Sequence, residues 1–117
     1  MTHDQHMQNC LKLCQECHSI CTATAQHCLE MGGKHAEGEH IRLLLDCAEI
    51  CQTSANFMMR KSPQHMSTCR ICAEICLSCA DSCARVNSQD LVMKNCEEVC
   101  RRCAQSCQQM AQIKAAA

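Results

Sequence analysis

The chain has 117 residues, of which 16 are cysteine, 8 are methionine and 7 are histidine, while Phe57 is its one residue among Phe, Tyr and Trp. Eleven lysines and arginines against twelve acidic residues leave a net charge of −1. This composition excludes nucleic-acid binding through a basic surface or stacked rings, and it excludes a basic surface for an anionic membrane. The length is that of one ordinary domain, so a single domain is predicted over residues 1–117.

Four helices are predicted from the sparse breaks in the chain, over residues 3–31, 38–61, 63–86 and 89–113. Ser62 is the expected N-cap of the third helix, with Pro63 in its first position. Ser88 is the expected N-cap of the fourth, with Asp90 in its first turn. The helix interiors are rich in good helix formers and lack the alternating runs of strands. The predicted fold is therefore all-α, an antiparallel up-down-up-down four-helix bundle.

Cysteines recur along each predicted helix at the spacing of one helix face, as in the core positions of packed helices. The sixteen are Cys10, Cys14, Cys17, Cys21 and Cys28; Cys47 and Cys51; Cys69, Cys72, Cys76, Cys79 and Cys83; and Cys96, Cys100, Cys103 and Cys107. All four stripes are expected to face inward, so the sequence predicts a core lined with cysteine. Seven Cys-x-x-x-Cys pairs can be drawn without reuse, which leaves Cys28 and Cys69 outside any pair.

Two simpler explanations of the cysteine stripes are disfavoured by physical arguments. A core that needs only packing uses Leu, Ile and Val, which bury more apolar area, and here such residues flank the stripes, as Leu44 and Val99 do. Disulfides within a helix are strained, because side chains four residues apart have Cβ atoms about 5–6 Å apart and a disulfide needs about 3.8 Å. Disulfides between helices need only a few facing pairs and do not explain a continuous lining.

Metal binding explains the stripes better, because an ion between two sulfurs adds its own length to the separation. Thiolates select Cu(I), Zn(II) or an iron–sulfur cluster. Four Zn(II) ions among sixteen thiolates leave a formal charge of about −8 inside the bundle, whereas one Cu(I) per thiolate leaves none. We therefore expect multiple Cu(I) ions per chain. A zinc or iron–sulfur protein and a thiol-redox or disulfide-linked helical protein remain the alternatives.

Softer and neutral ligands gather at the predicted helix ends. One end carries His3, His6, Met7, Met58, Met59, His65, Met66 and Met110. We expect Cu(I) to enter at this end, because thioether and imidazole bind Cu(I) without deprotonation. The expected ligands there are His3, Met7, Met58, His65, Met66 and Met110. The opposite end carries Cys28, Met31, His35, His40 and Met93, among which His40 is a further candidate ligand. His18 and His27 lie off the stripes, and we expect them to be solvated.

Other sequence features bear on partners and location. The second helix repeats Leu43, Ile50 and Phe57 at intervals of seven on a second apolar side, which predicts a homo-oligomer. No apolar run approaches the roughly 18 residues of a membrane span, and the N-terminus lacks the basic and apolar segments of an export signal, so a cytoplasmic protein is expected. No nucleophile, base and orienting group can be assembled from the polar residues outside the stripes, so no enzymatic activity is expected.

The repeated Cys-x-x-x-Cys pairs on every helix, from Cys10 onward, give the sequence a family resemblance. It resembles the copper storage proteins, cysteine-rich four-helix bundles that hold many Cu(I) ions inside. The resemblance covers the chain from Cys10 to Met110 and, without an export signal, is to the cytosolic branch. It implies Cu(I) storage or sequestration, a tetramer, thiolate ligands along the core and His/Met ligands at the ends. A copper chaperone is a further expected partner.

Overall fold

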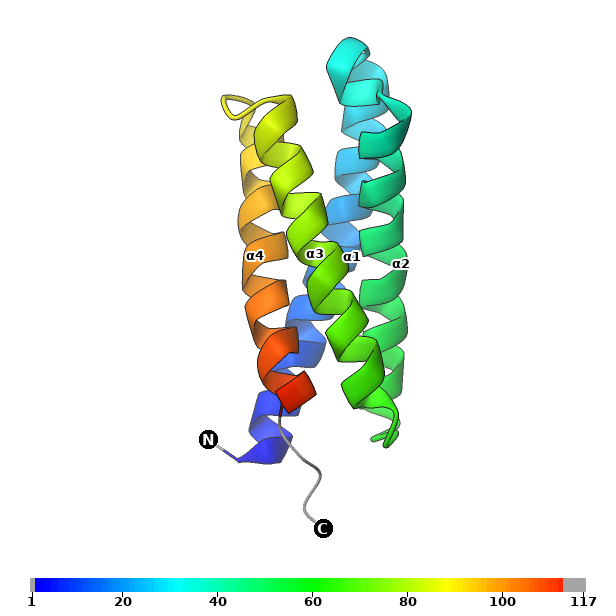
Figure 1. Ribbon diagram of the computed structural model, residues 1–117, viewed down its shortest axis with the longest axis vertical. Helices are drawn as coiled ribbons and strands as arrows, with labels where there is room; N and C mark the ends of the chain where they lie inside the picture. The colour runs from blue at the N-terminus through cyan, green and yellow to red at the C-terminus, as the bar shows by residue number, and fades with distance from the viewer. Residues whose placement is uncertain (1, 113–117) are drawn as a thin grey trace.

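The computed structural model describes residues 2–112, which form an antiparallel four-helix bundle (Figure 1). The helices are α1 (His3–Met31), α2 (Gly38–Met59), α3 (His65–Val86) and α4 (Leu91–Gln112), with a short 3₁₀ helix, η1 (Gly33–Ala36), between α1 and α2. Helix α1 lies beside α2 and α4, and α3 lies beside the same two helices, so the four enclose one central axis. The predicted all-α fold and topology are confirmed.

Helix α1 is the longest element, with 29 residues against 22 in each of the others. At 1.5 Å per residue it is about 43 Å long and the others about 33 Å. Its N-terminus is fixed by a capping box, in which Thr2 Oγ1 accepts from the Gln5 N–H at 3.1 Å and Gln5 Oε1 accepts from the Thr2 N–H at 2.7 Å. Its first turn extends below the end of α4 in Figure 1.

We call the two ends of the bundle the lower end and the upper end, as they lie in Figure 1. The lower end holds the start of α1, the end of α2, the start of α3 and the end of α4. The sequence placed the start of α3 two residues too early. Ser62 and Pro63 lie in the turn before it, since Lys61 takes a φ of 52° and the His65 N–H donates to the Ser62 carbonyl at 3.1 Å. This three-residue spacing closes a turn, and the regular helix begins only at His65.

The expected N-cap of α4 was also wrong. Asp90 has that role, because its Oδ1 accepts from the backbone N–H groups of Val92 at 2.9 Å and Met93 at 3.4 Å. Asn87 Oδ1 accepts from the N–H groups of Gln89 and Asp90, which holds the preceding residues in a turn and delays the helix to Leu91. No described helix has both the length and the hydropathy that crossing a bilayer requires.

Candidate metal centre

All sixteen cysteines are free thiols, and each is at most 1% exposed. They come from all four helices, as their stripe spacing predicted, and they form most of the buried core together with alanines and end methionines. Leu44 and Val99 are the branched aliphatic residues buried to a similar degree. The bundle axis is therefore lined by sulfur rather than by the hydrocarbon side chains of an ordinary helical core.

The thiols contact one another mainly between helices. Sγ atoms lie 3.6 Å apart in the pairs Cys10–Cys107, Cys14–Cys107, Cys21–Cys100, Cys47–Cys76 and Cys51–Cys72. Within a helix, the Sγ atoms of Cys17 and Cys21 are 3.9 Å apart. Most of these thiols touch more than one other thiol, so the core is a network of sulfur contacts rather than a set of isolated pairs.

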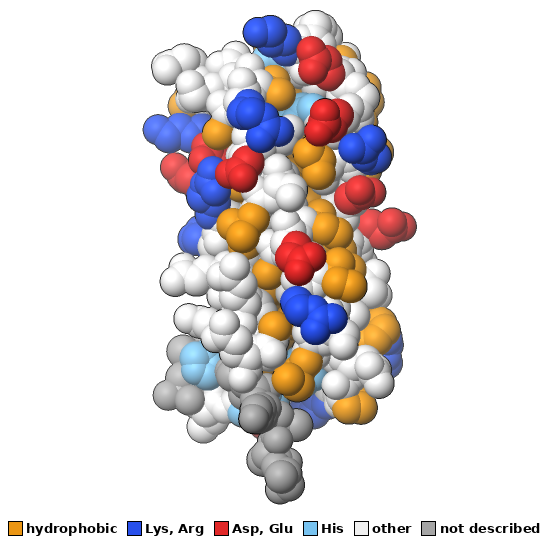
Figure 2. Space-filling model, in the orientation of Figure 1, with side chains coloured by type: hydrophobic (Ala, Val, Ile, Leu, Met, Phe, Trp, Pro, Cys, Tyr) orange, Lys and Arg blue, Asp and Glu red, His pale blue; other side chains and the backbone are white. Residues whose placement is uncertain are grey.

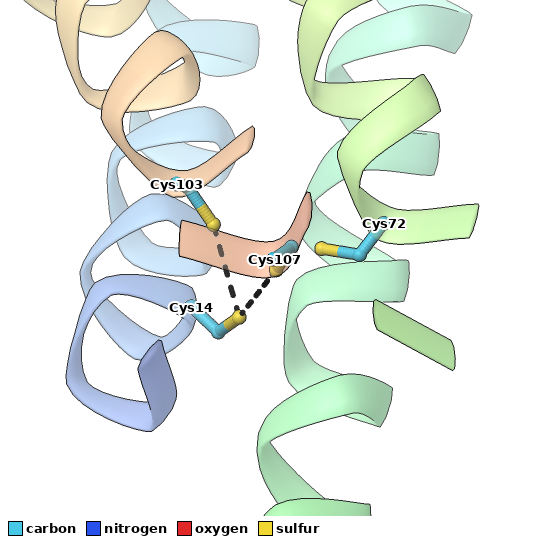
Figure 3. Close-up of side chains that lie close together, drawn as sticks. All are labelled: Cys14, Cys72, Cys103 and Cys107. Atoms are coloured by element: carbon cyan, nitrogen blue, oxygen red, sulfur yellow. Dashed lines mark hydrogen bonds between the residues drawn. The ribbon is translucent and has the colours of Figure 1, made fainter. Parts of the chain in front are cut away.

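Groups of four thiols have all their Sγ atoms within 4.8 Å of one another. In one group, Cys14 on α1, Cys72 on α3 and Cys103 and Cys107 on α4 point their sulfurs toward a common space (Figure 3). Further groups include Cys17/Cys47/Cys51/Cys76, Cys17/Cys21/Cys47/Cys100, Cys21/Cys79/Cys96/Cys100 and Cys51/Cys72/Cys76/Cys103. These five groups share members, since each has at least one thiol in common with another of the five.

These separations match those of sulfurs bound to one ion. With a metal–thiolate bond of about 2.3 Å, two ligands of a trigonal ion lie about 4.0 Å apart and two ligands of a tetrahedral ion about 3.8 Å apart. The Sγ–Sγ contacts run from 3.6 Å to 4.0 Å, so the shortest lie about 0.2 Å below these values and the longest match them. They are far longer than the roughly 2.05 Å of a disulfide. The core is thus dimensioned for soft metal ions bridged by thiolates.

Proton binding in this network is strongly coupled. Hydrogen bonds with neighbouring thiols raise the pKa of the Cys51 thiol, with Cys103 as the largest cause, and burial raises it further. For Cys17 the largest cause is a hydrogen bond with Cys100, which lowers the pKa of the Cys17 thiol. One thiolate is thus stabilised by neighbours that keep their protons. The sixteen thiols cannot all ionise until cations replace the protons, so filling the core with metal must release protons.

At the lower end, methionine sulfurs and imidazoles continue the thiol core outward. Met7, Met58 and Met110 are at most 4% exposed, and the Met58 Sδ lies 4.0 Å from the Cys69 Sγ. Cys69, which belongs to no Cys-x-x-x-Cys pair, is thus a junction between thiols and thioethers. Met66 is half-buried, and Met59 is exposed.

His3 and His65 lie side by side at this lower end, with ring centroids 5.9 Å apart. The Nε2 atoms of both rings are buried without a hydrogen-bond partner. The Nδ1–H of His65 donates to the Ser62 carbonyl at 2.8 Å. Because the neutral ring carries one proton, its Nε2 presents a bare lone pair, the form in which imidazole binds a metal.

The upper end has a smaller set of mixed ligands. The Cys28 Sγ lies 3.4 Å from the His40 Nε2 and 3.4 Å from the Met93 Sδ, and all three side chains are buried. His40 Nδ1 is 2.8 Å from the Ser82 hydroxyl, and a surface cavity of about 210 Å³ reaches both residues. Burial raises the pKa of the Cys28 thiol to about 11 and lowers the pKa of His40. Both groups are therefore held neutral until a cation arrives.

The structure corrects the expectation that His18 and His27 are solvated. His18 Nδ1 donates to the Ala48 carbonyl at 2.7 Å, which ties α1 to α2. The Nε2 atoms of His27 and His35 lie 2.8 Å and 3.1 Å from Oδ2 of Asp90. The hydrogen bond from His27 is the main cause that lowers the pKa of Asp90 to about 2. This cluster could not be predicted from sequence spacing, because Asp90 lies 63 residues from His27 and 55 residues from His35 along the chain.

A helical bundle with free thiols lining its axis and shared among neighbouring groups defines a class, the high-capacity thiolate metal-binding proteins. The chain matches the family model described as copper storage protein over residues 3–112. The chain therefore belongs to the copper storage protein family. The resemblance stated from the cysteine pattern is confirmed.

Solved structures agree with this assignment. The chain is 48% identical to the Nmul_A1745 protein of Nitrosospira multiformis, with a TM-score of 0.85 and coverage of 92% of this chain and 96% of that one. It is 30% identical to the Cu(I)-bound copper storage protein BsCsp3, with a TM-score of 0.84 over 91% and 98% of the two chains. It is 28% identical to a cytosolic copper storage protein from Streptomyces lividans, described with five coppers, at a TM-score of 0.84 over 97% and 98%.

Proposed function

We propose that this protein stores Cu(I) at high capacity, with the sixteen core cysteines as the thiolate ligands. The observation that carries the proposal is the sharing of thiols between adjacent four-sulfur groups, such as Cys17, Cys21 and Cys100, each of which belongs to two groups. A shared thiolate bridges two ions, as in a cluster, whereas isolated four-thiolate zinc sites each need their own ligands.

Charge supports Cu(I) as the cargo and sets the capacity. Among the residues that the structure describes, no lysine or arginine is buried in the core to neutralise the thiolates, and uncompensated buried charge is very costly. One Cu(I) per thiolate neutralises the core, so the filled protein holds about sixteen Cu(I), with further ions on neutral ligands at the ends. Relatives described as Cu(I)-bound, or loaded with 10 copper equivalents in the Streptomyces lividans protein, are consistent with this capacity.

Copper enters, in this proposal, at the lower end. The buried Nε2 atoms of His3 and His65, which have no hydrogen-bond partner, are the first inner ligands. Met7, Met58, Met66 and Met110 then carry the ion to Cys69 and the thiols beyond. Imidazole and thioether bind Cu(I) more weakly than thiolate, so ligand exchange runs inward. At the upper end, Cys28, His40 and Met93 form a mixed site that closes the core.

We further propose where the protein acts and how it assembles. It acts without catalytic turnover, as one domain over residues 1–117, in the cytoplasm, where the related Streptomyces lividans protein is described as cytosolic. A copper chaperone delivers or removes the ion. The protein assembles as a homotetramer through α2, whose Leu43, Ile50 and Phe57 are half-buried and whose Leu45 is 50% exposed. Hydrophobic side chains also lie between charged ones on the face in Figure 2.

Anaerobic titration of the fully reduced protein with Cu(I) tests storage. Native mass spectrometry counts the bound ions, and a chromophoric Cu(I) chelator reports when binding becomes weak. Storage predicts uptake that continues to about one ion per cysteine or beyond. Saturation after a few ions, or disulfides in the freshly purified protein, would instead favour the thiol-redox alternative. The same titration with Zn(II) provides the comparison metal.

A further inference from the structure

A second group of metal-binding side chains lies at the upper end, outside the thiol core. His27 is near the end of α1, His35 is in η1, and Asp90 precedes α4. The Nε2 atoms of both rings approach the same carboxylate oxygen, Oδ2 of Asp90, at 2.8 Å and 3.1 Å. The two rings are packed edge to face, with centroids 6.0 Å apart. Three elements thus direct two imidazole nitrogens and one carboxylate oxygen to one point.

The two oxygens of Asp90 have separate partners. Oδ1 accepts from the N–H groups of Val92 and Met93 and holds the first turn of α4. The hydrogen-bond partners of Oδ2 are the two imidazoles. The side chains of His35 and Asp90 are about nine-tenths buried, at 11% and 10% exposure, whereas that of His27 is 27% exposed. The cluster is therefore fixed on its inner side and open to water on the His27 side.

We propose that His27, His35 and Asp90 form a binding site for one divalent transition-metal ion, separate from the Cu(I) core. Two imidazoles and a carboxylate, without sulfur, favour Zn(II), Co(II), Ni(II) or Cu(II) over Cu(I). Ligands about 2.1 Å from a shared ion lie about 3.0–3.4 Å from each other at octahedral or tetrahedral angles. The Nε2–Oδ2 distances of 2.8 Å and 3.1 Å are close to that range.

Binding requires only local changes. Each neutral imidazole must carry its proton on Nδ1 so that Nε2 can bind the ion. Oδ1 of Asp90 remains the cap of α4, since only Oδ2 faces the ion. Water completes the coordination on the exposed His27 side. The ion joins α1, η1 and the start of α4, so it stabilises the end of the bundle next to Cys28 without using a thiol.

The test uses the full protein after its thiols have been filled with Cu(I), because free thiols also bind divalent ions. Copper content is measured first, and it tests storage separately from this site. Co(II) is then titrated anaerobically. The expected result is one Co(II) per chain with weak ligand-field bands, without the intense charge-transfer bands of cobalt–thiolate bonds, and a rise in melting temperature.

Variants decide whether the named residues bind the ion. The double variant H27Q/H35Q is expected to lose the bound Co(II) and the rise in melting temperature. The control His18→Gln keeps both, since His18 faces Ala48 and glutamine can still donate to that carbonyl. Asp90→Asn retains the oxygen that caps α4 and is expected to weaken Co(II) binding.

Should H27Q/H35Q fail to fold, Asp90→Asn provides the test. Unchanged Co(II) binding in the variants, no binding by the wild type, or sulfur charge-transfer bands would each overturn the proposal.

Discussion

Replacing Cys100 and Cys103 with serine tests the role of the thiols as ligands. Cys100 is fully buried, with its Sγ 3.8 Å from Cys17, 3.6 Å from Cys21 and 3.9 Å from Cys47. Cys103 lies 3.7 Å from Cys14 and belongs to two four-thiol groups. Serine is close to cysteine in shape, but its hydroxyl is not a soft anionic ligand. The change removes two of sixteen thiolates and leaves the helix pattern intact.

The expected loss follows from charge neutrality in the core. Two fewer thiolates neutralise two fewer cations, so the variant should hold about two fewer Cu(I) per chain. Two buried hydroxyls cost the apo protein roughly 1–3 kcal/mol each, depending on their hydrogen bonds. Native mass spectrometry resolves single ions, and circular dichroism reports apo helicity.

The matched control for this experiment is Ala80→Ser with Ala104→Ser. Both alanines are at most 1% exposed, so the control buries two hydroxyls while keeping all sixteen thiols. Its copper number should equal that of the wild type. A Cys100/Cys103 variant that folds and binds the full wild-type number would refute the assignment of these thiols as ligands.

Three further predictions follow from the ends and the thiol network. His65→Gln removes a buried imidazole Nε2, so stopped-flow loading with a Cu(I) donor should be slower, while the final capacity falls by at most about one ion. His18→Gln is the control. Equal loading rates in the two variants would contradict uptake at the lower end. The pKa of Asp90 is lowered to about 2 from the ordinary 3.8, so its contribution to stability is present above about pH 4 and is lost as the pH falls through about 2. In urea unfolding, the difference in unfolding free energy between the wild type and Asp90→Asn should therefore shrink over that pH range. A difference that stays constant would contradict this prediction. A thiol oxidant should cross-link helices of the apo protein, since Sγ atoms such as those of Cys47 and Cys76 are 3.6 Å apart, and should thereby lower its copper capacity. The Cu(I)-filled protein should resist this oxidation. Thiol counting measures the oxidation of both forms, and equal oxidation would contradict thiolate ligation.

The sequence predicted the parts of the fold that depend on local spacing. Cysteines repeated at helical intervals indicated both the helices and the inward face of each, and all sixteen are buried. Helix starts were less certain, because several residues near one boundary can cap a helix. Between Val86 and Leu91, the side chains of Asn87 and Asp90 compete with that of Ser88, and only the hydrogen bonds show that Asp90 caps the helix.

The grouping of the thiols could not be predicted from the sequence. Whether Cys17 faces Cys100 depends on the relative height and rotation of α1 and α4, which hydrophobic spacing leaves open. The same limit applies to the polar cluster at the upper end, since His27 and Asp90 are 63 residues apart. Cys28 and Cys69, by contrast, were visible as the two cysteines outside any pair, and each contacts a methionine at one end of the core.

Anomalous diffraction at the copper absorption edge, from crystals of the Cu(I)-loaded protein, tests the central claim most directly. Storage in the thiol core predicts a row of copper peaks along the bundle axis, each within bonding distance of cysteine Sγ atoms, with individual sulfurs such as Cys17 and Cys100 bound to more than one copper. An axis without copper, or copper confined to the outer surface of the helices, would contradict it.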